Sequence, residues 1–178
     1  MQSTKWLLDA THSELGFKIK HLMITNVSGK FNSFNVTAET FSDDFENANL
    51  SANIDVASIF TNNEQRDTHL RTSDFFEAEK YANISFTATS IKKQSDDELE
   101  VTGDLTIKDV TKPITFTVEY AGITKDPYGQ VKAGFSFAGK LNRKDWGVNF
   151  NAALETGGVM LGEEVKFEGE IQLVKQVA

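Results

Sequence analysis

The chain has 178 residues, of which 39% are hydrophobic and 25% are charged, and its formal net charge is -8 at neutral pH. This length predicts one domain, residues 1–178, built around one substantial core. The acidic balance disfavours nucleic acid as a partner, because contact with phosphate backbones needs a clustered basic surface. The absence of Cys excludes disulfides and thiolate metal ligands, so burial and backbone pairing must stabilise the fold.

Neither a signal peptide nor a membrane span is predicted. The first residues, Met-Gln-Ser-Thr-Lys-Trp, lack the apolar run of a leader, and no later stretch approaches the ~18 apolar residues of a spanning helix. The chain as written is therefore expected in the cytoplasm, and it is expected in the periplasm if a leader has been removed from it.

Alternation of apolar and polar residues recurs along the chain and predicts half-buried β-strands. The predicted strands are 15–19, 34–38, 47–56, 84–88, 99–107, 114–120, 131–137 and 165–173, with a ninth if 6–8 is counted. Short turn sequences such as Asp126-Pro127-Tyr128-Gly129 join several of them, which makes neighbours antiparallel. The fold class expected is all-β, and serial hairpins favour a closed antiparallel up-and-down β-barrel of about eight strands over a sandwich.

One segment, near residues 61–80, breaks the strand pattern and predicts a short helical insertion. Thr61 and Glu64 have the spacing of a capping box, so a helix should begin near Asn62. The run Ser73-Asp74-Phe75-Phe76 predicts another helical turn that packs aromatic rings onto the barrel. Such an insertion in a β protein either plugs one end of the core or covers the mouth of a binding cavity.

The sequence offers neither a metal site nor a catalytic motif. His12, His21 and His69 show no paired spacing on a helix or strand. No Gly-x-Ser-x-Gly elbow is present, and the glycine-rich run 157–162 lacks the Lys-Ser/Thr ending of a phosphate loop. That run is predicted to belong to an apolar flap, residues 142–162, over the interior.

Three polar side chains are predicted to lie at one end of the barrel. His21 continues the inward alternation that begins at Leu15, and Arg66 and His69 share one helix face with Leu70. Each of the three polar groups either satisfies backbone groups of the protein or contacts a polar head group of a ligand.

The predicted inward faces mix bulky and small residues. The small ones are Ala48, Ala52, Ala88, Gly103, Ala133, Gly139 and Gly169. Small inward residues leave space for a ligand, but the same alternation also fits the taper of a filled barrel. The pattern alone supports both interpretations equally.

Short motifs run in order over nearly the whole chain. They include Trp6-x-x-Asp9-x-x-His12-Ser13, Phe17-x-Ile19-x-His21, Val27-x-Gly29-x-Phe31, Arg66-Asp67-x-His69-Leu70, Asn142-Arg143-x-Asp145-Trp146-Gly147 and Gly162-x-Glu164-Val165. In this order the chain resembles the YceI-like family of polyisoprenoid-binding, lipocalin-like proteins. The resemblance implies an antiparallel barrel that holds a long apolar lipid, often in a dimer, and it brings no secure enzymatic role.

The expected function is non-catalytic binding of a polyisoprenoid or isoprenoid quinone inside the barrel, for carriage, storage or sensing. No metal or other cofactor is expected, and the expected partners are the lipid and a second copy of the chain. The alternatives are an enzyme acting on a bound lipid, with His21 or His69 as acid and base near Asp67, and a structural barrel with a filled core. The predicted ligand-binding residues are Phe17, Ile19, His21, Phe34, Leu50, Ile54, His69, Phe86, Leu105, Phe135, Phe137, Arg143, Trp146 and Met160.

Overall fold

The computed structural model describes residues 2–42, 44–152, 154 and 160–177. The strands are β1 (Thr4–Leu8), β2 (Glu14–His21), β3 (Thr25–Phe31), β4 (Phe34–Thr40), β5 (Asn49–Asp55), β6 (Ile59–Phe60), β7 (Asn83–Ser95), β8 (Glu98–Ile107), β9 (Val110–Lys125), β10 (Val131–Asn142) and β11 (Leu161–Lys175). The helices are α1 (Glu64–Leu70) and the 3₁₀ turns η1 (Ala10–His12), η2 (Val56–Ser58) and η3 (Arg143–Trp146). Within the described ranges, no helix has the length and apolar character needed to cross a bilayer.

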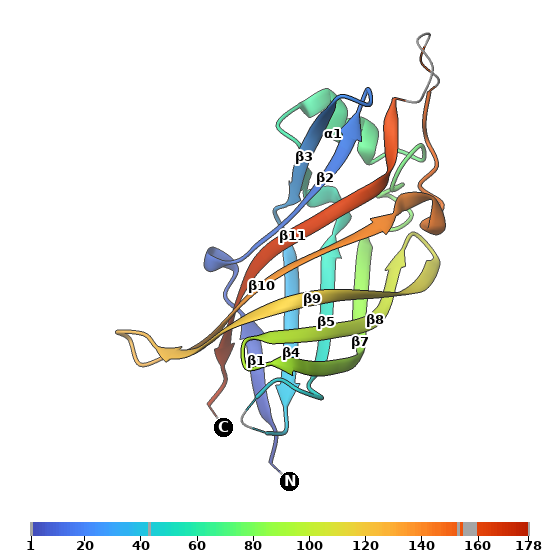
Figure 1. Ribbon diagram of the computed structural model, residues 1–178. Coiled ribbons are helices and arrows are strands. Elements are labelled where there is room, and N and C mark those ends of the chain that lie inside the picture. Colours follow the sequence, from blue (N-terminus) through green and yellow to red (C-terminus); the bar gives the residue numbers. More distant parts are fainter. Residues whose placement is uncertain (1, 43, 153, 155–159, 178) are drawn as a thin grey trace.

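The strands form one antiparallel sheet that closes into a barrel (Figure 1). The closed ring runs β1-β4-β5-β7-β8-β9-β10-β11 and returns to β1, where Trp6 pairs with Lys175. Three strands of this barrel are each interrupted by a few residues that are not in strand conformation. After the interruption, β1 continues as β2, β3 continues as β4 and β5 continues as β6. Each long strand neighbours the next one in sequence, which confirms the predicted up-and-down barrel of eight strands.

Two strands, β3 and the two-residue β6, were not predicted, and β3 was missed because few bulky apolar side chains lie on its inward face. β3 presents Val27, Gly29 and Phe31 to the interior, and a glycine in the middle of this series weakens the apolar alternation. The strand is nevertheless well paired, since β2 and β3 form a hairpin with Phe17 opposite Gly29. The optional strand at 6–8 is present as β1.

The insertion contains the predicted short helix, but its N-terminus is not capped by the predicted pair Thr61 and Glu64. α1 begins at Glu64, and its N-cap is Asn63, whose side-chain oxygen accepts a hydrogen bond from the backbone N–H of Arg66 at 2.9 Å. Thr61 is buried, and both its backbone N–H and its hydroxyl donate to Asp67. The capping-box prediction was therefore wrong, because the Thr61 hydroxyl is engaged by a carboxylate from the following helical turn.

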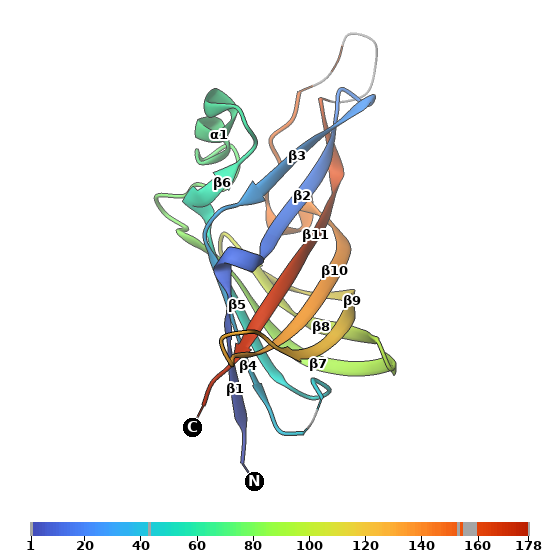
Figure 2. The same ribbon diagram turned by 90° about the vertical axis from the view of Figure 1, so that its left-hand side faces the viewer.

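The second predicted helical turn is a series of non-helical turns over residues 71–76. It does pack aromatic rings onto the barrel as predicted, since Phe75 is buried and Phe76 packs against the core. This segment lies beside β6 and α1, where the sheet has no further strand beyond β6 in the described chain (Figure 2). Side chains of the insertion, rather than a paired strand, therefore cover this side of the interior.

Several inward glycines lie beneath phenylalanine rings. Directly opposed pairs are Phe17 with Gly29, Phe137 with Gly169 and Phe167 with Gly139. A Cβ atom at any of these glycines would come within 2.4 to 2.7 Å of the partner ring, and Gly103 meets the Phe86 ring at 2.5 Å. At Gly103, Gly139 and Gly169 the small residue thus makes room for an aromatic ring and not directly for a ligand.

A cluster of charged residues fixes the break between β1 and β2. Asp9, at this break, pairs with Lys132 of β10 at 2.8 Å, and the same ammonium lies 3.5 Å from Asp126. The Nδ1 atom of His12, in η1, lies 2.9 Å from the same Asp9 oxygen, Oδ2, that the Lys132 ammonium contacts. The Lys132 ammonium holds the pKa of Asp9 well below its ordinary value, although partial burial opposes the shift.

We expect the Asp9–Lys132 pair to make stability pH-dependent. Because the pKa of Asp9 is depressed in the folded state, the stabilisation is fully present above the ordinary value of 3.8 and is lost as the pH falls below it. Thermal denaturation of Asp9→Asn should show a lower midpoint than the unmodified protein at pH 7, and the two midpoints should converge in strong acid. A midpoint difference that stays constant down to pH 2 would contradict the electrostatic explanation.

Candidate functional site

The barrel encloses a cavity of about 400 Å³. Its lining comes from every strand of the barrel wall except β1, together with α1, η3 and the segments that flank them. Five of the lining residues are polar, namely His21, Thr61, Arg66, His69 and Arg143, and the others are apolar residues or glycine. The volume falls within the range typical of sites for small molecules.

An aromatic cluster closes the end of the cavity that is nearer the chain termini. Phe45, from the connection between β4 and β5, is 5% exposed and packs edge-on against Phe135 at a centroid distance of 4.8 Å. The rings of Trp6 and Tyr120 also pack against the Phe45 ring, at centroid distances of 5.1 and 5.8 Å. This end of the cavity is therefore closed by aromatic side chains, and no charged side chain among the described lining residues lies there.

The polar residues of the cavity come from the opposite end. His21 ends β2, Arg66 and His69 lie on α1, and Arg143 begins η3, all of which lie at the upper end in Figure 1. The described lining contains two guanidinium groups and no carboxylate. The site is thus an apolar chamber with a polar, positively charged end.

Arg66 is anchored to the protein through uncharged partners. Its Nε donates to the Thr61 hydroxyl at 2.7 Å, and its Nη2 donates to the Thr61 carbonyl. These contacts hold the guanidinium at the cavity without neutralising it. The nearby Asp67 accepts from Thr61, so the Thr61 hydroxyl lies between this carboxylate and the Arg66 guanidinium.

His69 lies between two aromatic rings. Phe75 and Phe150 each meet the imidazole edge-on, at centroid distances of 5.1 and 4.9 Å. Its Nε2 lies 2.8 Å from Asp74. The histidine therefore links α1 to the turn that follows it and to the segment after η3, at the rim of the cavity.

Arg143 fastens the connection between β10 and β11. Its Nε donates to the Gly162 carbonyl at 2.8 Å and its Nη1 donates to the Val148 carbonyl at 2.7 Å. The side chain is 4% exposed, and its Nη2 has no hydrogen-bond partner among the described residues. Burial lowers the pKa of Arg143, but a guanidinium stays protonated at neutral pH.

Thirteen of the fourteen predicted ligand-binding residues line the cavity, from Phe17 on β2 to Met160 before β11. Trp146 is the exception. Its indole is 3% exposed, its Nε1 donates to the Leu105 carbonyl at 2.9 Å, and it does not line the cavity. Trp146 was predicted to line the cavity, but in the structure its ring packs in the barrel wall against Leu105. Residues 153 and 155–159 of the predicted flap lie outside the described residues.

The prediction also omitted several residues that line the cavity. Phe116 and Phe167 belong to predicted strands, and their alternation with polar neighbours was a sufficient signal. Phe45 and Phe150 come from connections without a repeating pattern, so no sequence periodicity could place them.

The chemistry required by the enzymatic alternative is not assembled around Asp67. Its carboxylate accepts hydrogen bonds from Thr61, whereas His69 is oriented by Asp74. Within the described ranges, no three His, Cys, Asp or Glu side chains converge in a way that would hold a metal ion. The geometry instead resembles a container with anchored polar groups at one end.

Comparison with known proteins agrees with this architecture. The UPF0312 protein SAS2572 of Staphylococcus aureus (strain MSSA476) is 44% identical over 170 residues, which cover 95% of this chain and 96% of that protein. The crystal structure of the Campylobacter jejuni YCEI protein has a TM-score of 0.77 and 32% identity, covering 96% of this chain and 97% of that one.

A more distant structure shares the fold. A polyisoprenoid binding domain from Saccharophagus degradans, implicated in plant cell wall breakdown, has a TM-score of 0.72 at 14% identity and covers 96% of this chain and 98% of that one. The model of the YceI-like domain matches residues 6–173 of this chain. With this match, the closed eight-stranded barrel and its cavity place the chain in the YceI-like family.

Proposed function

We propose that the protein binds a long-chain apolar lipid inside the barrel without chemically changing it. The single observation that carries this proposal is the apolar chamber of about 400 Å³ with polar groups at one end only. A polyisoprenoid or the tail of an isoprenoid quinone matches the chamber, and its head group would lie between α1 and η3.

The energetics are compatible with retention of such a lipid. Removing roughly 600 Å² of apolar ligand surface from water contributes about 15 kcal/mol before costs are subtracted. Association and ordering consume about 4 to 15 kcal/mol of this, so burial of the tail alone can hold a lipid. Membership of the YceI-like family and the polyisoprenoid binding domain that shares the fold support the same class of ligand.

Organic extraction of gently purified protein, followed by mass spectrometry, tests the proposal directly. We expect a stoichiometric apolar species, and restoring a polyprenol or quinone to the extracted protein should raise its thermal midpoint. A lipid present at 100 times its Kd stabilises the fold by about 2.7 kcal/mol, which corresponds to a rise of roughly 5 to 11 °C for a chain of this size.

A cavity-filling variant supplies the matched control. Ala52 lines the chamber, so Ala52→Trp should place an indole inside it and abolish the lipid-induced rise. Ala138 is exposed on β10, and Ala138→Trp should leave the rise intact. Lipid-free preparations from a lipid-replete host, together with an unmoved midpoint on adding polyprenols, quinones and fatty amides, would refute the proposal.

The two guanidinium groups predict a preference for an acidic head group. Arg66→Gln should weaken binding of a prenyl phosphate by about 1 to 3 kcal/mol while leaving the matching prenyl alcohol nearly unchanged, because only the phosphate loses a charged partner. Isothermal titration with both ligands measures this difference. Arg143→Gln is the comparison, and we expect it to lower the thermal midpoint of the empty protein, since Arg143 joins Gly162 to Val148.

Equal losses for phosphate and alcohol in Arg66→Gln would assign Arg66 a purely structural role through Thr61. In that case Arg66 would give no preference for a charged head group, and a quinone would be as good a candidate as a prenyl phosphate.

A further inference from the structure

The loop that joins β2 to β3 exposes three consecutive apolar residues. Leu22, Met23 and Ile24 are 40%, 55% and 78% exposed. Isolated exposed apolar residues are common on soluble proteins, but a run of three at the tip of a hairpin marks a surface that contacts something apolar.

The backbone of this loop is also unfavourable for the residues that occupy it. Leu22 and Met23 have φ values of 54° and 66°, and the Ile24 N–H donates to the His21 carbonyl at 3.2 Å. Two successive residues with positive φ form a type I′ turn, for which Asn-Gly is the favoured sequence. Leu and Met are strained in this conformation, so neither solubility nor turn stability explains their presence.

The loop lies beside the polar end of the cavity. His21 immediately precedes it and lines the cavity, and the Leu22 N–H donates to the carbonyl of Met160, another lining residue, at 2.8 Å. The β2–β3 hairpin rises at the same end of the barrel as α1 (Figure 1). A surface that received the loop would therefore adjoin this end of the cavity.

Lysines form a row across the outer face of β2, β11 and β10, and the β2 member of this row lies four residues before the loop. Lys18 of β2 lies directly opposite Lys166 of β11, which lies directly opposite Lys140 of β10. Like charges in directly opposed positions destabilise a sheet. Glu168 and Glu164 approach Lys18 and Lys140 only at 3.8 and 3.9 Å in exposed positions, where ion pairs contribute little.

We propose that the loop Leu22–Ile24 and the row Lys18–Lys166–Lys140 dock the protein onto an anionic lipid bilayer. The lysines attract acidic head groups to this part of an otherwise acidic protein, and the three apolar side chains enter the interface. A second copy of this chain fits less well, because a two-fold contact through the same patch would bring two lysine rows together. The docking does not depend on the content of the cavity, so its failure would leave the proposed function standing.

Vesicle co-sedimentation of the full chain tests this proposal. We expect binding to vesicles of phosphatidylcholine mixed with phosphatidylglycerol, weaker binding at high salt, and little binding to phosphatidylcholine alone. Lys18→Gln combined with Lys166→Gln should weaken binding about 25-fold, since each lysine near an anionic surface contributes a factor of about five.

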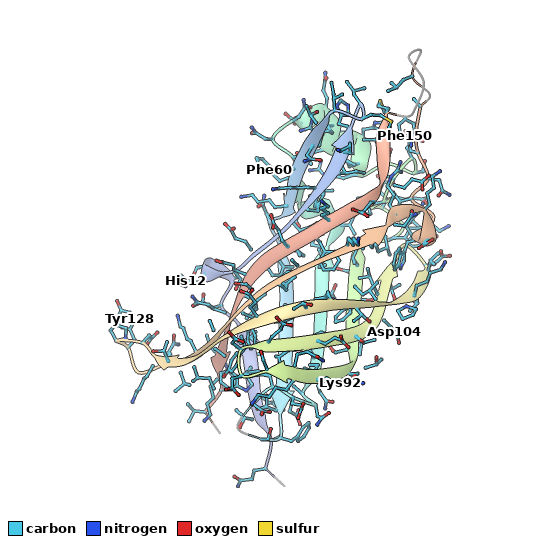
Figure 3. All side chains as sticks on the ribbon, viewed as in Figure 1. His12, Phe60, Lys92, Asp104, Tyr128 and Phe150 are labelled. Carbon is cyan, nitrogen blue, oxygen red and sulfur yellow. The ribbon has the colours of Figure 1, made fainter. Side chains whose placement is uncertain are left out.

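The double variant Leu22→Asn, Met23→Gly gives the sharpest result. It installs the sequence that the turn favours, so its thermal midpoint in solution should rise while vesicle binding falls at least tenfold. Tyr128→Asn is the matched control. Tyr128 is 91% exposed at the tip of the β9–β10 hairpin, away from the β2–β3 hairpin (Figure 3), and its loss should leave vesicle binding unchanged.

Two results would overturn the proposal. One is vesicle binding by the double variant that equals that of the unmodified protein. The other is a change from dimer to monomer in the double variant, measured by sedimentation velocity, without any vesicle binding to lose. That result would assign the loop to a contact between two copies of the chain.

Discussion

Replacing Trp146 with alanine is expected to lower the free energy of unfolding by about 3 to 5 kcal/mol. The indole is 3% exposed and packs in the wall outside the cavity. Truncation would leave a void there and would also remove the hydrogen bond from Nε1 to the Leu105 carbonyl, leaving that acceptor without its partner. Urea denaturation followed by circular dichroism measures the loss.

Two further measurements separate a wall position from a ligand contact. Trp146→Phe retains most of the buried ring and should lose clearly less stability than the alanine variant. In a Trp6→Phe background, the emission of Trp146 should stay unchanged when lipid saturates the cavity, because the ring does not line it. A shifted emission maximum at demonstrated saturation would place Trp146 against the ligand after all.

Replacing Gly169 with alanine is expected to destabilise the barrel by about 3 kcal/mol or more, although it adds only one methyl group. The new Cβ would lie 2.2 Å from the Glu14 carbonyl oxygen and 2.7 Å from the Phe137 ring. The oxygen belongs to the backbone of the neighbouring strand β2, so it cannot rotate away as a side chain can. Relief requires β2 and β11 to separate locally.

Gly134→Ala provides the control on an adjacent strand. A Cβ at Gly134 would have the Ala121 Cβ as its nearest neighbour, at 3.6 Å, which is an ordinary contact. Its unfolding free energy should be unchanged or should rise by about 0.5 to 1 kcal/mol, because alanine loses less backbone entropy than glycine on folding. Equal denaturation midpoints for Gly169→Ala and the unmodified protein would contradict this prediction, because they would show that β2 and β11 can move apart at little cost in free energy.

The strands were predictable wherever one face is apolar along its whole length. β5, β8 and β11 follow the alternation because one side of each strand meets the interior and the other meets water. β3 was not predicted because Gly29, in the middle of its inward face, has no apolar side chain of its own. The space above Gly29 is filled by the ring of Phe17, which comes from another strand. The breaks in the long strands depend on similar contacts between strands, such as that of Asp9 with Lys132.

In the candidate site, too, residues on strands were predictable and residues in the connections between strands were not. Inward positions on strands, such as Phe86 and Phe137, were found because the direction of a side chain follows from strand periodicity. Trp146 and Phe45 lie in connections, where the chain direction is set by tertiary contacts. A buried aromatic residue in a connection can face the cavity or the wall, and the motif Asp145-Trp146-Gly147 does not distinguish between them.

The edge of β6 has a consequence for how quickly a lipid could leave. Most of the barrel wall is joined by backbone hydrogen bonds, but beyond β6 the interior is covered by Leu70, Phe75 and Phe76 of the insertion. Side-chain packing opens locally at lower free energy than a paired sheet. A long tail could then depart sideways through this covering without being drawn lengthwise past the aromatic rings. Dissociation rates across a series of polyprenols would level off with chain length, since a single local opening would set the rate for all of them.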